Sequence, residues 1–398
     1  MIRLDLSAQP AVPLDPSIEK HIGQLTDFSR AKTPLEISAI QDLYSEDEDF
    51  WQGVALGLKT DWRVYDLLLR KLHYKRDSSY TTNERSSIMR FLTMAYLITR
   101  DVRYFNEWLF FANDEVTRDA GLMRSVFSRN LDENGHHVFP LATPDLVRDS
   151  IKQVHETVRS APHSKSAAPL RIGLLGTPSS YTNAYRVIQM QGHDPEIVFF
   201  SYDKDTKRRF IKSNRLLAKL IFLLKGCRLP YTVISESYGS PAITQQLNDL
   251  HLNLGFQRVA FIVKNNIIKC FPSGLLNSHL AILPYVRGRS SIEFSLLFGF
   301  PVGATVHYVD EGVDTGEILK TFAYEPSELS SRTISGIRRE IDMRADDWIL
   351  ETLSYVSNYK AVPIANPLEK GLQYFTMHPS LVNYIDANLF VTRPSEGS

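Results

Sequence analysis

The sequence has little cysteine and no long apolar run. Two of its 398 residues are cysteines, Cys227 and Cys270, and neither stands in a CxxC or Cys/His spacing. A disulfide framework and a cysteine-based zinc site are therefore excluded, and we expect no metal. No apolar run approaches the roughly 20 residues that span a bilayer, and no signal peptide is recognisable. We expect a soluble, unprocessed, cytoplasmic protein without a membrane partner.

The sequence also lacks an excess of charge of either sign. Lys plus Arg and Asp plus Glu both number 45, so there is no overall attraction to nucleic acid, and no nucleic-acid partner is expected. The run from Lys204 to Arg228 carries nine Lys and Arg against Asp205 alone. It is typical of a solvated helix face, with an anion-binding site as the alternative. A P-loop and a GxGxxG fingerprint are absent, which argues against ATP hydrolysis and dinucleotide redox chemistry.

The first part of the chain has the apolar spacing of helices. With 43% hydrophobic residues the chain can form two or three cores. A Ser/Ala/Pro-rich stretch from Arg159 to Leu170 then indicates a domain boundary. We predict a mainly helical N-terminal domain, residues 1–160, of unknown role. Its two apolar stripes are Trp62, Tyr65, Leu68, Leu69 and Leu72, and Ile88, Phe91, Leu92, Ala95 and Tyr96.

After this boundary short apolar runs alternate with longer helical or polar pieces, which predicts βαβ units and a Rossmann-like, mostly parallel sheet of the α/β class. We place this domain at residues 169–358, with helical spacing from Leu329 to Val356. Residues 359–398, rich in proline, should form an irregular tail or a small appendage. The expected strands are Arg171–Thr177, Glu196–Tyr202, Pro230–Ser235 and Arg258–Val263.

Polar residues suited to acyl transfer follow these strands. Asn277 and His279 are two apart, so on an extended segment they point the same way. An amide can stabilise an oxyanion while an imidazole moves a proton. Asp314 lies 35 residues beyond His279, a separation that one return of the chain can close, and its carboxylate would favour the charged imidazole.

The segment from Leu275 to Leu319 resembles the folate-dependent formyltransferases, which include glycinamide ribonucleotide transformylase, methionyl-tRNA formyltransferase and the amino-sugar N-formyltransferases. The resemblance extends weakly from about Leu170 to Val356 and does not reach the first 160 or so residues. The family pattern is Asn-x-His, Leu-Leu-Pro, Arg-Gly, Gly-x-Thr-x-His and Asp-x-Gly. The matching residues are Asn277-Ser278-His279, Ile282-Leu283-Pro284, Arg287-Gly288, Gly303-Ala304-Thr305-Val306-His307 and Asp314-Thr315-Gly316.

The resemblance implies 10-formyltetrahydrofolate as the formyl donor and a role for each matched residue. Asn277 would bind the formyl oxygen, His279 would donate or accept a proton, and Asp314 would hold His279 or a relay water. A serine that many members carry is replaced by Ala281. The family's folate contacts are mostly main-chain, and they fall here on Asn266, Ile267 and Ile268 and on Asp310, Glu311, Gly312 and Val313.

Two further residues of the segment allow more than one interpretation. His307 should lie on a strand, and a structural role is favoured over a direct catalytic one. Arg287 could meet an anionic group of a ligand or anchor its loop. Because no Ser or Cys stands next to His279 as a nucleophile, we expect direct transfer without a covalent enzyme intermediate.

We therefore predict an enzyme that transfers a formyl group to the primary amine of a small substrate, such as a nucleotide-linked amino sugar or an amino-acid-like metabolite. Methionyl-tRNA is disfavoured because no β-barrel domain is evident after the catalytic domain and the chain has no net positive charge. A formyltetrahydrofolate hydrolase and a non-catalytic binding or scaffold module are the alternatives. Whether the chain forms a homo-oligomer stays open.

Overall fold

The computed structural model describes residues 48–77, 79–112, 131–133, 136–159, 169–201, 215–224, 229–234, 236, 240–259, 261–358 and 362–388. The chain divides into two compact units, Met1–Pro140 with Phe375–Tyr384, and Leu141–Tyr374 with Ile385–Ser398. Most of the predicted linker from Arg159 to Leu170 lies outside the described residues. Of the basic run from Lys204 to Arg228, only helix α12 (Arg215–Leu224) is described.

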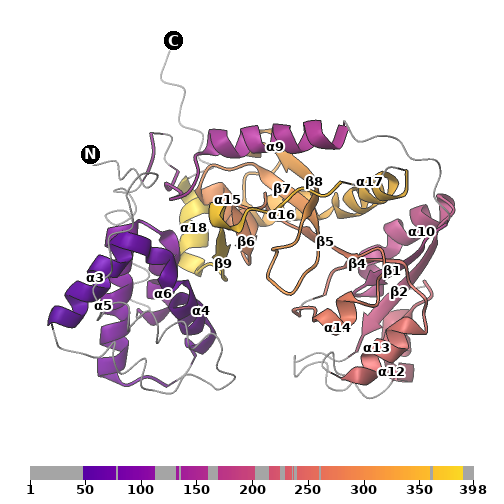
Figure 1. The fold of residues 1–398 in the computed structure, drawn as a ribbon, viewed down its shortest axis with the longest axis horizontal. Helices are drawn as coiled ribbons and strands as arrows, with labels where there is room; N and C mark the ends of the chain where they lie inside the picture. The colour runs from indigo at the N-terminus through magenta and orange to yellow at the C-terminus, as the bar shows by residue number, and fades with distance from the viewer. Residues whose placement is uncertain are drawn as a thin grey trace, which may run out of the picture. The chain divides into compact units, whose positions relative to one another are not determined.

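The first unit is helical, as predicted, and both apolar stripes are buried in it. Helix α5 shows why its sequence begins and ends where it does: Thr81 and Glu84 form a capping box at its start, and Arg100 ends it with a left-handed φ of 61°. The elements, drawn in indigo and purple in Figure 1, are α3 (Glu48–Asp61), η2 (Trp62–Tyr65), α4 (Asp66–Lys75), α5 (Thr82–Thr99) and α6 (Val102–Phe111).

Part of the predicted C-terminal tail completes this helical unit. The Asn106 side chain donates to the Thr376 carbonyl at 3.1 Å and accepts from the His378 amide at 2.7 Å. The ring of Phe375 stacks on His73, with centroids 4.4 Å apart. The prediction of an irregular tail or a small appendage is wrong here, because these bonds join residues about 270 positions apart that no local pattern connects.

The buried His137 gives the helical unit a predicted pH dependence. It is 1% exposed, and burial is the main reason that its pKa is lowered to about 4. Between pH 6.5 and 4 the unfolded chain binds a proton at this residue that the folded chain does not, so the free energy of unfolding falls as the pH falls, by about 3 kcal/mol at pH 4. In His137→Gln, urea unfolding at several pH values should show that this loss is reduced.

The neighbouring His136, which is partly exposed, provides a matched control. His136→Gln should retain the pH dependence of the wild type. Parallel stability curves for the wild type and His137→Gln would contradict the assignment.

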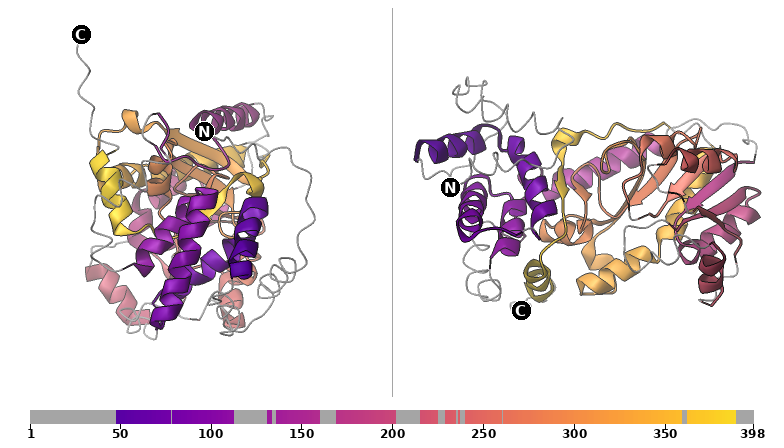
Figure 2. Two further views of the ribbon diagram at one scale, coloured as in Figure 1. Left: turned by 90° about the vertical axis from the view of Figure 1, so that its left-hand side faces the viewer. Right: turned by 90° about the horizontal axis from the view of Figure 1, so that it is seen from below.

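The second unit is built on a seven-stranded sheet in the order β3-β2-β1-β4-β5-β7-β8. The first five strands in this order are parallel, β7 runs antiparallel to both of its neighbours, and β8 therefore runs in the same direction as the first five. This confirms the predicted α/β class with a mostly parallel sheet. Figures 1 and 2 show the twist of this sheet. The strands are β1 (Arg171–Leu175), β2 (Asp194–Phe200), β3 (Thr232–Ile234), β4 (Leu254–Gln257), β5 (Leu275–His279), β7 (Val302–Tyr308) and β8 (Ile318–Tyr324).

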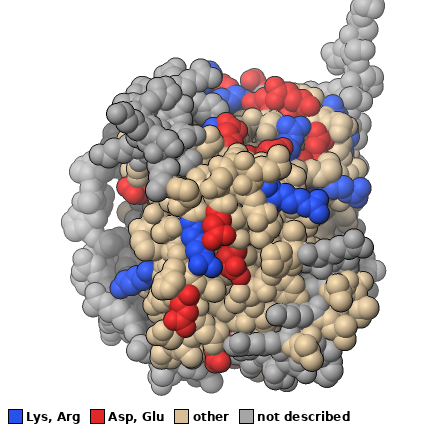
Figure 3. Space-filling view, turned by 90° about the vertical axis from the view of Figure 1, so that its right-hand side faces the viewer, with Lys and Arg blue, Asp and Glu red and all other residues tan. Residues whose placement is uncertain are grey.

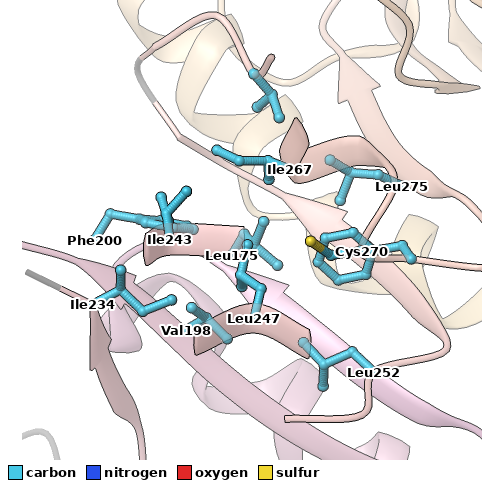
Figure 4. Close-up of a cluster of buried hydrophobic side chains, with 12 residues drawn as sticks. Leu175, Val198, Phe200, Ile234, Ile243, Leu247, Leu252, Ile267, Cys270 and Leu275 are labelled. Atoms are coloured by element: carbon cyan, nitrogen blue, oxygen red, sulfur yellow. The ribbon is translucent and has the colours of Figure 1, made fainter. Parts of the chain in front are cut away.

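Helices cover the sheet by burying their apolar sides. In the cluster of Figure 4, Ile243 and Leu247 of α13 (Pro241–Asn248) and Ile267 of α14 (Asn265–Ile268) pack against Leu175, Val198 and Leu275 of the strands. Full burial of each such side chain contributes about 1.5–3 kcal/mol. Further elements of the unit are η4 (Pro178–Tyr181), α10 (Thr182–Met190), α15 (Ser291–Leu297), η6 (Pro326–Glu328), α16 (Ile334–Asp342), α17 (Ala345–Asn358) and η7 (Leu368–Lys370). Helix α18 (Pro379–Asn388) begins in the first unit and ends in the second.

Helix α9 (Pro144–Arg159) belongs to the second unit, although it precedes the predicted linker. It packs on β8, and Arg148 forms a bidentate ion pair with Glu325 at 2.8 and 3.0 Å. Arg148 also donates to the Gly299 carbonyl at 3.3 Å. The division between the units therefore falls after Pro140 and not near residue 160.

The fourth predicted strand is displaced. Strand β4 is Leu254–Gln257, and the predicted strand Arg258–Val263 is the chain that leaves the sheet after it. The Arg258 side chain forms an ion pair with Asp346 at 3.1 Å. Val263 lies in a loop, and its side chain is buried in the core. An apolar run that is buried outside a strand has the same composition as one inside it, so the pattern alone misplaced this strand.

Charges of both signs are mixed on the face of the molecule that Figure 3 shows. In Figure 3, Lys and Arg atoms lie interspersed with Asp and Glu atoms on this face and form no field of one sign, as the balanced composition predicts. Within the described part of the chain, no helix combines the length and apolar character that crossing a membrane requires.

Candidate active site

Strands β5 and β7 bring the first two polar side chains together. Leu275 and Leu276 are fully buried and anchor β5 in the sheet. Asn277 then pairs with His307 across the antiparallel ladder, and the amide Nδ2 lies 3.3 Å from the imidazole Nε2. The cross-strand register therefore places His307 beside the predicted catalytic amide.

Asp314 joins these residues from the loop between β7 and β8. It adopts a left-handed backbone with a φ of 53°, and the Asn366 side chain holds its loop by donating to the carbonyls of Asp314 and Gly316, both at 3.1 Å. Its Oδ1 accepts from Asn277 Nδ2 at 3.2 Å. Its Oδ2 lies 3.2 Å from His279 Nδ1. The structure thus brings the predicted Asn277, His279 and Asp314 together.

Hydrogen-bond chemistry assigns protons to the two imidazoles. His279 Nε2 lies 2.9 Å from the Val286 carbonyl, and His307 Nδ1 lies 2.7 Å from the Tyr308 carbonyl. A carbonyl only accepts, so each of these nitrogens carries a hydrogen. Neutral His307 can then accept from Asn277 at Nε2. His279 needs a second proton, on Nδ1, to donate to Asp314.

Burial and charge act in opposite directions on this pair. Burial lowers the pKa of His279, and the negative charge of Asp314 opposes that shift. Burial alone would raise the pKa of Asp314, but the charge of His279, the contact with His307 and the Gly288 N–H, which donates to Oδ2 at 2.9 Å, hold it below its usual range. The site therefore keeps an ionised carboxylate beside an imidazole that gains its second proton below the usual pH range.

A pocket opens over this group at the carboxyl ends of β4 and β5. Asn277, His307 and Asp314 form its floor. One wall is the segment after β4, with Phe261, Ile262 and Val263, and the other is the segment after β7, with Val309, Asp310, Gly312 and Val313. His279 is not part of the lining: it is 6% exposed and contacts the carboxylate of Asp314, which does line the pocket.

The predicted folate contacts divide into two groups. Asp310, Gly312 and Val313 line the pocket, whereas Glu311 of the same loop is exposed and is not among the lining residues. Asn266, Ile267 and Ile268 lie on α14 and do not line it. Asn266 donates to the Thr244 hydroxyl at 3.3 Å, and Ile267 is part of the buried core. On this side the pocket is lined by Phe261, Ile262 and Val263.

Main-chain groups complete the site, and the motif match, although it included Gly288, assigned no role to them. The Val286 carbonyl and the Gly288 N–H come from β6 (Val286–Gly288), a short strand outside the main sheet that pairs with β9 (Leu372–Tyr374). Arg287 donates to the Gly371 carbonyl at 3.4 Å, which agrees with its role as a loop anchor.

Beside the carboxyl ends of the parallel strands β4 and β5, an amide donor, an ionised carboxylate and two imidazoles form a candidate site for group transfer. The family comparison agrees: residues 231–340 match the formyl transferase family. This stretch runs from β3 into α16 and contains Asn277, His279, His307 and Asp314. This part of the chain is thus a formyl transferase domain, and the resemblance seen in the motifs is confirmed.

Curated relatives match over the same region. Methionyl-tRNA formyltransferase of Corynebacterium glutamicum is 25% identical over 169 residues, 42% of this chain and 51% of that protein. Cytosolic 10-formyltetrahydrofolate dehydrogenase of Xenopus laevis is 29% identical over 157 residues, 38% of this chain and 16% of that protein. The chain spans about half the length of the methionyl-tRNA formyltransferase.

Solved structures are similar at lower identity. A sugar N-formyltransferase from a Shewanella species is 18% identical, with a TM-score of 0.39 over 57% of this chain and 89% of that one. Glycinamide ribonucleotide transformylase 1 from Symbiobacterium toebii is 20% identical, with a TM-score of 0.37 over 46% and 86%. The family assignment rests on the sequence match and the motifs.

Proposed function

We propose that the chain transfers a formyl group from 10-formyltetrahydrofolate to the primary amine of a small substrate. The observation that carries this proposal is the joining of Asp314 to Asn277, His279 and His307 beneath a pocket within the matched domain. Formyltransferase family members use this donor.

The pocket walls suit a flat heteroaromatic ring. Phe261, Val263 and Val309 offer apolar surface, and the loop through Gly312 offers main-chain donors and acceptors to the edge of such a ring. Ile262 is 53% exposed although it lines this pocket. A bound pterin would cover apolar surface that is otherwise in contact with water, which supports the placement of the donor here.

The polar floor can perform each step of the transfer. The amine nitrogen forms a bond to the formyl carbon, and the bond from that carbon to the donor nitrogen breaks. Negative charge develops on the formyl oxygen. Asn277 Nδ2 keeps one hydrogen on His307 and donates to this oxygen the hydrogen that Asp314 Oδ1 accepts in the free site. The carboxylate of Asp314 accepts the proton that leaves the amine. The departing nitrogen takes up a proton, so the reaction consumes none.

His279 acts through Asp314 in this scheme. Its Nδ1 faces Oδ2 of the carboxylate at 3.2 Å, and its other nitrogen is fixed by the Val286 carbonyl. A buried imidazole in this position orients the carboxylate and adjusts its basicity as the proton moves. We propose that His307 holds the amide of Asn277 in the donating orientation.

The acceptor we propose is a small amine, such as a nucleotide-linked amino sugar or an amino-acid-like metabolite. On the face that Figure 3 shows, Lys and Arg lie among Asp and Glu and form no extended cationic patch for RNA, and the chain has no net charge. After α17 the described residues contain η7, β9 and α18, and no barrel domain. Because methionyl-tRNA formyltransferases are among the relatives, Met-tRNA belongs in the test as a separate acceptor.

The test measures consumption of 10-formyltetrahydrofolate with and without each acceptor. We expect turnover that depends on one of the small amines. Rapid turnover in water alone would identify a hydrolase. Turnover with Met-tRNA and with none of the small amines would show that the acceptor is a tRNA. Folate binding without any turnover would indicate a ligand-binding module.

Two variants distinguish the two candidate folate walls. Ile262→Asn places a polar group on the pocket wall, where it removes apolar contact with a bound ring, and should weaken folate binding about tenfold, since 1.4 kcal/mol corresponds to that factor. Asn266→Ala, on α14, should leave binding unchanged. Titration of folate by fluorescence quenching measures both. If folate binding weakened in Asn266→Ala and not in Ile262→Asn, the folate contact would lie on α14, as predicted from the sequence.

A further inference from the structure

One short strand supplies the main-chain groups that hold both ionisable residues of the pair. In β6, the Val286 carbonyl accepts from His279 Nε2 at 2.9 Å, and the Gly288 N–H donates to Asp314 Oδ2 at 2.9 Å. These two groups are two residues apart on one strand. A displacement of β6 would therefore move His279 and Asp314 together.

Strand β6 pairs with β9, and each residue of β6 lies opposite a residue 86 positions later in the chain. The pair is parallel, with Val286 opposite Leu372 and Gly288 opposite Tyr374. The Leu372 amide donates to the Tyr285 carbonyl at 3.0 Å, and the Arg289 amide donates to the Tyr374 carbonyl at 3.0 Å. Strand β9 lies beyond residues 231–340, the part that matches the family, and beyond the catalytic domain predicted from the sequence.

The two strands approach each other too closely for side chains at two glycines. A Cβ on Gly371 would lie 1.6 Å from the Pro284 carbonyl oxygen. A Cβ on Gly288, where φ is +92°, would lie 2.3 Å from the Tyr374 carbonyl oxygen. The Tyr374 ring is buried against Phe294, with centroids 4.3 Å apart. The position of β6 is thus set by β9.

We propose that β9 is a positioning element of the active site, which fixes the Val286 carbonyl and the Gly288 N–H and through them the His279–Asp314 pair. This inference rests on the proposed function for its kinetic consequence. The folate walls come from other segments, so loosening β9 lowers kcat and leaves folate affinity unchanged. A misplacement of about 1 Å at catalytic groups costs on the order of a hundredfold in rate.

Gly371→Ala tests this directly, because its methyl group meets backbone and forces β9 away from β6. We expect kcat to fall at least tenfold with an unchanged folate dissociation constant. Gly192→Ala is the matched control: Gly192 has a φ of +86° and nothing within 4 Å of the added carbon, so it is strained but remote from β9. It should lose stability and retain kcat.

A second pair of variants addresses the packing of β9 if Gly371→Ala does not fold. Tyr374→Phe keeps the ring that contacts Phe294 and should retain wild-type kcat. Tyr374→Leu removes the ring and should lower kcat with folate affinity unchanged. Equal kcat in Tyr374→Leu and Tyr374→Phe would overturn the inference.

A readout without turnover separates this inference from the proposed function. With isotopically labelled histidine, the His279 ring signals, assigned with His279→Gln, report its contacts with Val286 and Asp314. The ionisable groups that face this ring are Asp314, His307 and Arg287. Gly371→Ala should shift these signals and Gly192→Ala should not. If Gly371→Ala shifts these signals but the wild type shows no formyl transfer, the proposed function is wrong and the role of β9 stands. If the signals are unchanged in Gly371→Ala, the role of β9 is wrong.

Discussion

Asp314→Asn should lower kcat by roughly 10²–10⁴-fold, the range that a positioned general base contributes. The amide keeps the shape of the carboxylate but has no charge, so it can neither take the proton from the amine nor stabilise a charged His279. The pocket walls are untouched, and the folate dissociation constant should stay the same. Steady-state kinetics and folate titration measure the two effects separately.

Glu311→Gln provides the control for this variant. It removes one negative charge from the same loop at an exposed residue that is not part of the pocket lining. We expect near wild-type kcat. If both variants lost activity equally, the effect would come from the charge or mobility of the loop, and the role of Asp314 as the base would be wrong.

Asn277→Leu should lower kcat by about 10²–10³-fold, the typical cost of removing one donor to a developing oxyanion. Leucine has a similar volume and branches at the same carbon, but it cannot donate to the formyl oxygen or to His307. Ser278→Ala, at the next position of β5, is the matched control, because side chains alternate across a strand and Ser278 points to the opposite side. A large loss in Ser278→Ala with full activity in Asn277→Leu would reverse the assigned faces of β5.

The sequence predicted the side chains of the site because its motif consists of side chains. Asn277 and His279 share one side of β5, and Asp314 returns to them as the spacing predicted. His307 was given a mainly structural role because its position depends on the register between β5 and β7. Single-strand periodicity contains no information about that register.

Main-chain contributions and long-range contacts could not be predicted. The motif match included Gly288 but gave its N–H no role, and Val286 is in no motif, because side-chain patterns do not report main-chain hydrogen bonds. The division of the chain depends on pairs such as Arg148 with Glu325, 177 residues apart, and Asn106 with Thr376, 270 apart. These pairs decide where a shortened protein that contains the second unit should begin. A chain that begins near Leu170 lacks α9, whereas one that begins near Leu141 keeps it.

The fate of the formyl carbon tests the central claim most directly. With 10-formyltetrahydrofolate labelled by ¹³C at that carbon, and nucleotide-linked amino sugars and amino acids as acceptors, the products are resolved by mass spectrometry. The account predicts that the label appears in an N-formyl amine, at a rate that Asp314→Asn lowers by roughly 10²–10⁴-fold and that Glu311→Gln leaves near the wild-type value. Label recovered as formate, at the same rate with and without acceptor, would contradict it.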